Sequence, residues 1–580
     1  MTIPYRPSLA AALAALLLFA APVAAGQQAS RAPGAESPPN QGPKPPATGE
    51  RVMVSTQLPI VTETALDVLR DGGNAVDAMI TAVFLQHVVD FHQVSHFGTM
   101  SAIYYEAGTG EYHVISAVSK RPRADRCGEG DPSQVAIGGV VKGLAALADR
   151  FGTLEWEEYL QPAIAAAEEG VLVTSFMYGV NYAMFEGGDS LIKDNPAAMR
   201  AYMPDGHLVP VGERWKRPAL AGHLRSLAEE GADYMYTGKW GRKFVDAARD
   251  KGYCVSTEDM ASYDVEWQEP ARFSYRGYDM VGSPPPDTGG PVVGFNLSVL
   301  ENFDLGSMGH YSEDPDTLEI LARTFQRVSA ETGGSIRDPL NYNVPLELWY
   351  SDEYGALAAR FVRDTMLREG IELRAPEGSE TARLGDRSAA PAFAAADEAG
   401  HPDLGSNHNV IADGDGNWFS MLHTGHGGAP GVFIDGVRAT GSGASADTMG
   451  PGRRLVLPIT AVMLERQGED GPFMAMGTPG SPPQPITEVL VNLIDFGMDP
   501  LDAVDAPRFW AGRYDDDVDI RIESRISAEV REGMTSRGLK LDELGFYNWH
   551  TGSIQIVWRD EDGMLHGVTD PRRLGMAKGF

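Results

Sequence analysis

A serine that can act as a nucleophile stands where a polar stretch gives way to a strand-like segment. The stretch, residues 374–404, is rich in Ala, Glu, Asp, Gly and Pro, so we expect it to be mobile and exposed. Gly405 and Ser406 follow it, and a hydroxyl there can attack the preceding glycine carbonyl and cut the chain by an N-to-O acyl shift. The freed α-amine, with a reference pKa of about 8, then serves as the base for its own hydroxyl. The simpler interpretation is a turn residue with a local hydrogen bond.

Other arrangements that carry chemistry are missing from the sequence or incomplete. It has no Gly-x-Ser-x-Gly, His-Glu-x-x-His or Walker motif. His92 and His96 are four residues apart, and His408, His423 and His426 lie close to Ser406 in sequence. A metal needs further converging ligands, whereas a histidine near an active site more often orients a substrate or satisfies a core hydrogen bond. We therefore expect no metal and no cofactor.

The elements that must position Ser406 alternate between helical and strand patterns. Strands are predicted at residues 408–412 and 418–424, joined by the hairpin signal Asp413-Gly414-Asp415-Gly416. Two further strands at 101–105 and 112–118 form a second hairpin, and others are expected at 455–464 and 473–476. Helices are expected from residue 62, from residue 74, and at 140–150, 155–169, 486–496 and 501–506. Antiparallel sheets with helices packed outside them make an α+β layered fold.

Composition excludes several classes of partner. The chain has 580 residues, with 48 Lys and Arg against 80 Asp and Glu, and a formal net charge of −32. Binding to nucleic acid or to a membrane surface through a basic face is therefore not expected. Hydrophobic residues make up 43% of the chain, so a sizeable core can form.

The N-terminal region is typical of an exported protein. Arg6 precedes an apolar run over residues 9–21, and Val23 and Ala25 supply the small residues of a cleavage site, which predicts a signal peptide over residues 1–25. Six prolines in residues 26–50 predict a flexible tether, and a periplasmic or secreted location follows. Cys127 and Cys254 are the only cysteines, and either one disulfide or two buried thiols fits them.

Several motifs, collinear from about Gly72 onward, together resemble the gamma-glutamyltranspeptidase family of N-terminal-nucleophile hydrolases. The motifs are Gly73-Asn74-Ala75-Val76-Asp77-Ala78, Tyr275-Arg276-Gly277-Tyr278, Pro284-Pro285-Pro286-Asp287-Thr288-Gly289-Gly290, Asp415-Gly416-Asn417, Asp495-Phe496-Gly497-Met498-Asp499 and Ala503-Val504-Asp505-Ala506-Pro507-Arg508-Phe509. The resemblance implies a four-layer αββα sandwich, made as one precursor that cuts itself. It also implies a heterodimer of a large subunit, residues 51–405 after the tether, and a small subunit, residues 406–580.

The resemblance assigns the catalytic roles. Ser406 matches the family's nucleophilic Thr, with processing between Gly405 and Ser406, and Thr424 matches a Thr whose hydroxyl holds the nucleophile. The family's oxyanion turn appears as Gly477-Thr478-Pro479-Gly480-Ser481, so the backbone N–H groups of Gly480 and Ser481 would stabilise the oxyanion. A plain Pro-Gly connection is the alternative interpretation of that turn.

The substrate-binding part of the pattern departs from the family. The arginine that grips the glutamyl α-carboxylate is replaced by Val118, the paired serines by the region 455–458, and the aspartate on the α-amino group by Thr440. We therefore expect an amide hydrolase or acyltransferase with altered, non-glutamyl specificity, acting on a small-molecule amide that Thr440, His92, His96 or His426 positions. Lys120, Arg121 or Arg438 could still restore a carboxylate site. A true gamma-glutamyltransferase and a secreted binding protein of the same fold are the alternatives.

Overall fold

The structure is a computed structural model that describes residues 42–123, 125, 134–186, 195–366, 405–440, 450–479, 483–515 and 518–580. The predicted signal peptide, most of the tether, the segment 374–404, Cys127, Gly480 and Ser481 lie outside the described residues. Cys254 is buried and disulfide-bonded. Within the described part, no helix combines the length and apolar character needed to cross a membrane.

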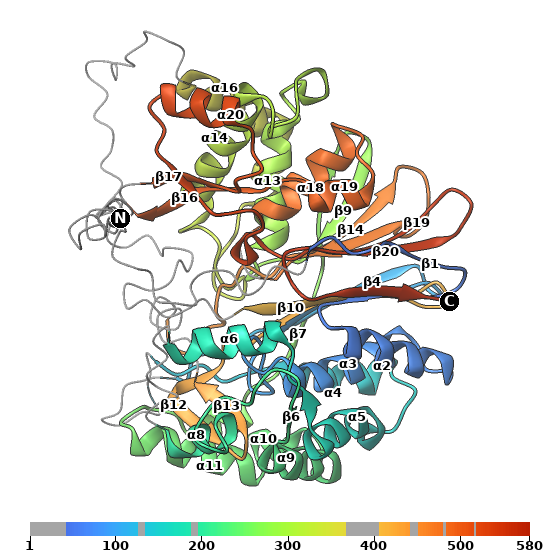
Figure 1. Cartoon of the computed structure of the whole chain (residues 1–580), viewed down its shortest axis with the longest axis vertical. Helices are drawn as coiled ribbons and strands as arrows, with labels where there is room; N and C mark the ends of the chain where they lie inside the picture. The colour runs from blue at the N-terminus through green and yellow to red at the C-terminus, as the bar shows by residue number, and fades with distance from the viewer. Residues whose placement is uncertain are drawn as a thin grey trace, which may run out of the picture.

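Two seven-stranded antiparallel sheets stack face to face at the centre of the molecule (Figure 1). The first has the order β1-β20-β19-β15-β14-β9-β8. Its strands are β1 (Ala47–Gly49), β8 (Ala271–Tyr275), β9 (Tyr278–Gly282), β14 (Ala461–Arg466), β15 (Met474–Gly477), β19 (Gln555–Arg559) and β20 (Leu565–Thr569). The second has the order β21-β2-β10-β11-β3-β4-β7. Its strands are β2 (Met53–Thr56), β3 (Thr99–Glu106), β4 (Glu111–Ala117), β7 (Glu266–Gln268), β10 (Ser406–Ala412), β11 (Trp418–Thr424) and β21 (Met576–Gly579).

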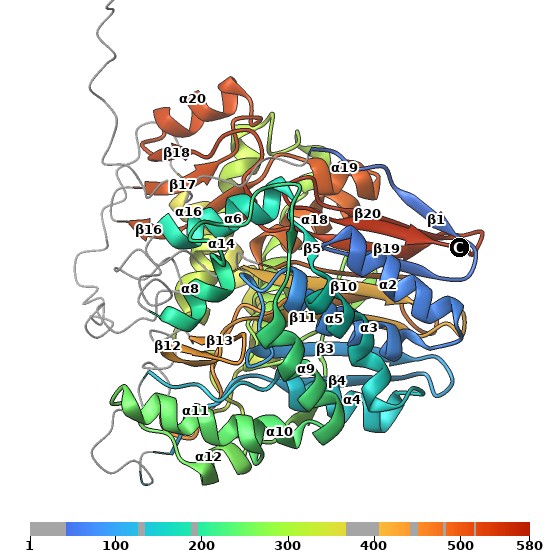
Figure 2. The same ribbon diagram turned by 60° about the horizontal axis from the view of Figure 1, so that its bottom comes forward.

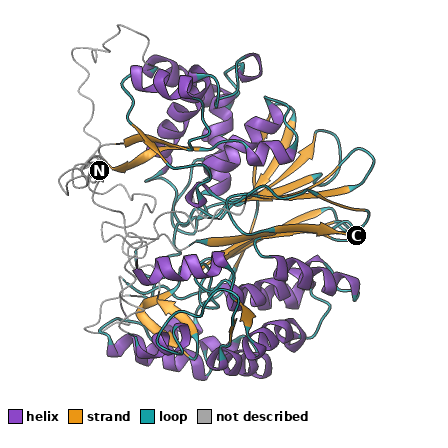
Figure 3. Ribbon diagram, in the orientation of Figure 1, coloured by secondary structure: helices purple, strands orange, loops and turns teal. Residues whose placement is uncertain are grey.

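Helices cover the outer face of each sheet (Figure 3). On the side of the second sheet lie α2 (Pro59–Arg70), α3 (Ala75–Val89), α4 (Val140–Phe151), α5 (Trp156–Glu169), α6 (Ser175–Glu186), α8 (Pro196–Tyr202), α9 (Pro218–Glu230), α10 (Asp233–Tyr236), α11 (Lys239–Asp250) and α12 (Thr257–Ala261). On the side of the first sheet lie α13 (Gly289–Leu300), α14 (Pro315–Thr332), α15 (Leu346–Trp349), α16 (Asp352–Thr365), α18 (Gln484–Ile494), α19 (Pro500–Asp505) and α20 (Ala528–Ser536). The predicted four-layer αββα sandwich is confirmed.

Smaller elements complete the described chain. They are the pairs β5 (Val171–Leu172) with β6 (Arg214–Trp215) and β12 (Gly428–Ile434) with β13 (Val437–Thr440), the three-stranded sheet of β16 (Phe509–Asp515), β17 (Val518–Ile522) and β18 (Leu541–Glu543), and the 3₁₀ turns Leu305–Ser307 and Trp549–Thr551. Figure 2 shows β12 and β13 beyond the ends of the central strands.

Side-chain alternation along β10 contributes to two separate hydrophobic clusters. Val410 and Ala412 of β10 point into the layer between the two sheets, whereas Ile411 packs with the helices around α3. This is the period of two that a strand buried on both faces requires. Ser406 and the rest of β10 are therefore held from both sides.

The first family-like motif is a helix start. Asn74 caps α3 by accepting hydrogen bonds from the N–H groups of Val76 and Asp77 at 2.8 and 3.0 Å, and the Asp77 carboxylate accepts from the Asn74 N–H at 2.9 Å. Asp77 also accepts from the Tyr159 hydroxyl at 2.7 Å, which ties α3 to α5. Capping therefore explains the motif. It fixes the start of α3, the helix that runs from there toward Ser406.

Two sequence predictions are wrong in their limits. The strand expected over 455–464 begins only at Ala461, because residues 455–459 contain Pro458 and pack as an apolar cluster with Val118. The tether expected up to residue 50 already includes β1, since Ala47–Gly49 pairs with β20.

Candidate active site

Ser406 is the first residue of β10 and lies directly opposite Thr424, the last residue of β11. Both side chains are buried, with Ser406 8% and Thr424 2% exposed. The Thr424 hydroxyl donates a hydrogen bond of 3.2 Å to the carbonyl oxygen of Gly405. That carbonyl is the group that Ser406 would attack during self-cleavage, so Thr424 is placed to polarise it. The contact differs from the expected one to the Ser406 hydroxyl.

A buried polar chain that the sequence did not predict holds the Gly405–Ser406 junction. Arg573 donates hydrogen bonds to the Ser406 carbonyl oxygen at 3.3 Å and to the side-chain oxygen of Gln93 at 2.6 Å. Gln93 in turn donates to the Asp90 carboxylate at 2.6 Å. A Cβ added to Gly405 would collide with the Gln93 side-chain oxygen, so any larger residue here would displace Gln93 from its contacts. Gln93 and Arg573 are 480 residues apart, and no spacing signal links them.

The two histidines expected at the substrate lie in different surroundings. His92 Nε2 is 2.6 Å from Asp90 Oδ1, close behind the Gln93 contact. His96 instead packs in the helix layer, with its ring centroid 4.5 Å from that of His87 and 5.2 Å from that of His223. Burial, followed by the charges of His223 and Arg217, lowers the pKa of His96 well below its ordinary value, so it is neutral. The structure does not bring His92 and His96 together.

His408 and His423 are buried on the strand pair of Ser406. His408 shares a 2.9 Å hydrogen bond with Ser420, and His423 one of 2.8 Å with Gln86 of α3. Burial lowers the pKa of each to about 3, so both are neutral at physiological pH. Among the described residues, no group of three or more His, Cys, Asp or Glu side chains is arranged to hold a metal ion.

His426 and Arg438 lie beside the end of β11. Burial, and then the positive charge of Arg438, lowers the pKa of His426 to about 4. A Cβ on Gly425 would collide with Arg438 Nη2, which places that guanidinium against the residue following Thr424. Thr440 is two residues beyond Arg438 on β13 and pairs with Gly428.

Val118, Leu455 and Leu457, which lie at positions where the sequence departs from the family pattern, belong to one apolar cluster. It consists of Val118, Ala136, Leu422, Leu455, Leu457 and Ile459. Leu422 lies two residues before Thr424 on β11, so the cluster reaches the strand that faces Ser406. Nearby cations have partners: Arg454 forms a 2.8 Å ion pair with Asp338, and Arg123 a 3.0 Å ion pair with Asp125.

The turn expected to carry the oxyanion donors begins at the end of β15. Gly477 lies against the His408 ring of β10, where any larger residue would collide with Nε2. Thr478 continues from it, with its hydroxyl oxygen accepting from the Ser553 N–H at 3.1 Å. The first part of the turn therefore crosses β10 two residues from Ser406, while Gly480 and Ser481 lie outside the described residues.

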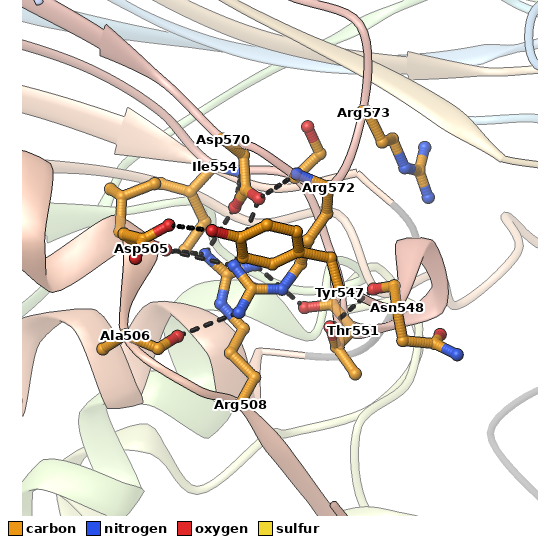
Figure 4. A network of polar contacts seen from close by, with 12 residues as sticks. Asp505, Ala506, Arg508, Tyr547, Asn548, Thr551, Ile554, Asp570, Arg572 and Arg573 are labelled. Atoms are coloured by element: carbon orange, nitrogen blue, oxygen red, sulfur yellow. Dashed lines mark hydrogen bonds and ion pairs between the residues drawn. The ribbon is translucent and has the colours of Figure 1, made fainter. Parts of the chain in front are cut away.

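A second buried network fixes the segment that carries Arg573 (Figure 4). Arg572 forms a two-pronged ion pair with Glu523, at 2.7 Å for each prong, and Asp570 lies 2.5 Å from Arg508. Burial opposes ionisation of Asp570, yet Arg508 and Arg572 hold its pKa below the ordinary value. The Arg573 side chain points away from this network, toward Ser406. Arg508, which belongs to a family-like motif, is thus structurally linked to the candidate nucleophile.

The chain is similar in sequence and in fold to known proteins. The family model for "Gamma-glutamyltranspeptidase" matches residues 61–580. The Acylase ACY 1 proenzyme of Pseudomonas sp. (strain SE83) is 28% identical over 90% of this chain and 93% of its own, and the glutathione hydrolase proenzyme of Escherichia coli (strain K12) is 25% identical over 91% of each. Among solved structures, a cephalosporin acylase from Bacillus halodurans superposes with a TM-score of 0.77 at 24% identity, covering 93% of this chain and 98% of that one.

Proposed function

Because the chain belongs to the gamma-glutamyltranspeptidase family, we propose that Ser406 is the nucleophile of its amide chemistry and that the chain is cut before this residue. The protein is an enzyme, an amide hydrolase or acyltransferase of the N-terminal-nucleophile type that is made as a self-processing precursor. The observation that carries the assignment of Ser406 is its place at the start of β10 beside the Gly405 carbonyl, which accepts the Thr424 hydrogen bond.

Self-cleavage follows from this arrangement in two steps. The Ser406 hydroxyl attacks the Gly405 carbonyl carbon, the C–N bond breaks, and the nitrogen takes up a proton to become a free α-amine. Water then hydrolyses the ester, which leaves a carboxylate on Gly405. The Thr424 hydrogen bond to the carbonyl oxygen strengthens as negative charge develops there, and it therefore favours the first step.

Substrate turnover uses the same hydroxyl with its new base. The α-amine of Ser406 accepts the hydroxyl proton as Oγ attacks the substrate amide, and it returns that proton to the leaving amine. The acyl group is held as an ester until water or an acceptor amine releases it. We assign the oxyanion donors to the N–H groups of Gly480 and Ser481, supported by the approach of Gly477 to β10.

The proposed specificity excludes a zwitterionic glutamyl group. Val118, Leu455 and Leu457 are buried in an apolar cluster at positions where the family uses charged or hydroxyl groups. Leaving a carboxylate and an ammonium without partners there would cost several kcal/mol. An amide with a less charged acyl group is the better substrate, in keeping with the relatives named as acylases.

We further propose that the precursor is exported and that its two fragments stay assembled. Residues 1–25 would direct the precursor out of the cytoplasm, and residues 26–405 and 406–580 would remain together as a heterodimer. The proenzyme names of the relatives support processing into subunits.

Intact-mass measurement of the purified protein tests the nucleophile directly. The wild type should yield two fragments that meet between Gly405 and Ser406, and Ser406→Ala should yield one uncut chain without amidase activity. Ser406→Thr is the matched control, because it keeps the hydroxyl and should still cut. A wild-type protein that is active as a single chain would falsify the assignment.

A further inference from the structure

Lys44 is a half-buried cation in the segment that precedes β1, and the reaction as described does not use it. Its ammonium group donates hydrogen bonds to the backbone oxygens of Asp570 and Arg573, at 2.7 Å each, and a longer one of 3.4 Å to that of Gly42. An ammonium group has three N–H donors, and these three oxygens engage all of them. Lys44 therefore joins the start of the described chain to residues that lie 526 and 529 positions further on.

The two short contacts of Lys44 lie at the two ends of one turn. This turn, residues 570–573, directly follows β20, and its last residue is Arg573. The side chain of Arg573 donates hydrogen bonds to the Ser406 carbonyl oxygen and to Gln93, while its backbone oxygen accepts from Lys44. Lys44 thus fixes the backbone from which Arg573 extends to the candidate nucleophile.

The sequence around Lys44 restricts the freedom of its backbone. Pro43 precedes it and Pro45 and Pro46 follow it, and a proline fixes its own φ angle and restricts the residue before it. Shortly afterwards β1 begins at Ala47, which is paired with Gly567 of β20. Because this segment is stiff and anchored, little conformational entropy is lost when the ammonium group binds the turn.

The charge on Lys44 changes in a physiologically accessible range of pH. Burial, opposed by the Asp570 carboxylate and assisted by the Arg572 guanidinium, lowers the pKa of Lys44 to about 8. These two charged groups that face it belong to the same turn. At pH 7 the ammonium form prevails, whereas above pH 8 the neutral amine keeps N–H donors but loses the charge that strengthens their hydrogen bonds. The hold of Lys44 on the turn therefore weakens as pH rises through about 8.

We propose that Lys44 is a positioning residue for the reactions of Ser406. By holding both ends of the 570–573 turn, it sets the place of the Arg573 guanidinium at the Gly405–Ser406 junction. The segment before β1 is then part of the working site as well as a tether. This inference rests on the proposed function of Ser406 as the residue before which the chain is cut.

The rate of self-cleavage tests the inference without a known substrate. Full-length chains are pulse-labelled in cell-free synthesis, and the uncut fraction is followed over time on denaturing gels. Lys44→Met removes the donor and should slow cleavage about tenfold at pH 7, the lower end of what a hydrogen bond to a charged group contributes. Lys44→Arg keeps a charged donor and should retain most of the rate. Lys578→Met is the matched control, because Lys578 forms a partly exposed ion pair with Glu63, and it should cut at the wild-type rate.

The pH profile of cleavage separates positioning from a merely structural role. The uncut precursor has no α-amine at Ser406, so the titration of that group does not contribute. The ratio of the wild-type rate to that of Lys44→Met should fall as pH rises through about 8, because the wild type loses its charge there. The ratio of wild type to Lys44→Arg should fall in the same range, since a guanidinium stays charged. Slowing of Lys44→Met by the same factor at every pH overturns the inference.

A double-mutant cycle shows whether Lys44 acts through Arg573. If it does, adding Lys44→Met to Arg573→Met should slow cleavage no further, whereas two independent, multiplying effects overturn the inference. Uncut variants should elute in size-exclusion chromatography at the volume of Ser406→Ala, which shows that they are folded. If Lys44→Met does not, the pH profile of Lys44→Arg alone decides. Cutting of folded Lys44→Met at the wild-type rate overturns the role of Lys44 only, while a wild-type chain that stays uncut contradicts the proposed function and this inference together.

Discussion

At the scale of single residues, Thr424 links the fold to the proposed self-cleavage before Ser406. Its hydroxyl donates to the Gly405 carbonyl oxygen at 3.2 Å, and the side chain is buried. Thr424→Val removes this donor while keeping the β-branched shape, and loss of one oxyanion donor typically slows a reaction by roughly 100- to 1000-fold. We expect self-cleavage to slow by about that factor, measured as the uncut fraction on gels over time. Thr424→Ser should cut normally, and fast cutting in the valine variant would show that the contact is incidental.

Asp287 gives a pH-dependent prediction. It is fully buried, and burial raises its pKa to about 7 against the opposing effects of Ser101 and Arg454. Between the unfolded value of 3.8 and about 7, the folded state holds a proton that the unfolded state has lost, so this group makes stability fall as pH rises. Asp287→Asn should therefore stabilise the protein relative to wild type at pH 8, by up to about 4 kcal/mol, and much less at pH 4. Urea unfolding at the two pH values measures this, and an equal effect at both would contradict it.

Residues with a local signal could be located from the sequence, whereas their partners distant in the chain could not. Ser406 follows a polar segment and begins a strand, whereas Thr424 is assigned through the family resemblance. The register of the hairpin places the two residues opposite each other. Gln93 and Arg573 carry no such signal, because a buried hydrogen bond between residues 480 apart depends on tertiary packing alone. The roles of all the candidate site residues remain predictions, namely Ser406, Thr424, His92, His96, His426, Thr440 and the N–H groups of Gly480 and Ser481.

At the scale of elements, the hairpin β10–β11 is anchored through its turn. Asp413 accepts hydrogen bonds from the N–H groups of Asp415 and Asn417, each at 3.0 Å, and from that of Ala75 at 2.9 Å. The last contact joins the hairpin to the start of α3, the helix that carries Gln86 to His423. The register of Ser406 against Thr424 therefore depends on a carboxylate at the opposite end of the strands.

Asp413→Ala should destabilise the protein by about 2 to 4 kcal/mol, because it leaves several N–H groups without an acceptor. Chemical unfolding measures the change, and self-cleavage should slow as well if the register loosens. Asp415→Ala in the same turn is the control, since Asp415 is exposed and its removal should cost little. Equal losses in both variants would contradict the anchoring role.

Elements with a strong local pattern were predicted well. The strand predicted at 418–424 agrees with β11, and the helices predicted at 140–150 and 155–169 agree with α4 and α5 to within a residue. The strand predicted from residue 455 begins only at Ala461, because an apolar run can fill a hydrophobic cluster as well as a sheet and Pro458 has no N–H to donate to a neighbouring strand. Hydrophobic periodicity indicates which residues are buried, but it does not show which neighbouring element covers them.

At the scale of the whole molecule, the proposed cut would produce two interleaved subunits. In the second sheet, β2 of the large subunit lies between β21 and β10 of the small one, and in the first sheet small-subunit strands are flanked by β1 on one side and β9 on the other. We expect the fragments to co-elute as one particle in size-exclusion chromatography with light scattering, and to separate only in denaturant. Ser406→Ala, uncut, should elute at the same volume, and a free small fragment in native buffer would contradict this arrangement.

The contacts of Arg573 make the proposed processing depend on residues that are synthesised well after Ser406. Met53 of β2 is opposite Gly579, and Arg573, which contacts Ser406 and Gln93, lies only a few residues before the C-terminal Phe580. A nascent chain on the ribosome cannot build this junction until Arg573 has been translated, however early Ser406 emerges. Such long-range contacts also make folding slow. A chain that stops before Arg573 would lack the arginine that holds the Gly405–Ser406 junction, so we expect it to remain uncut.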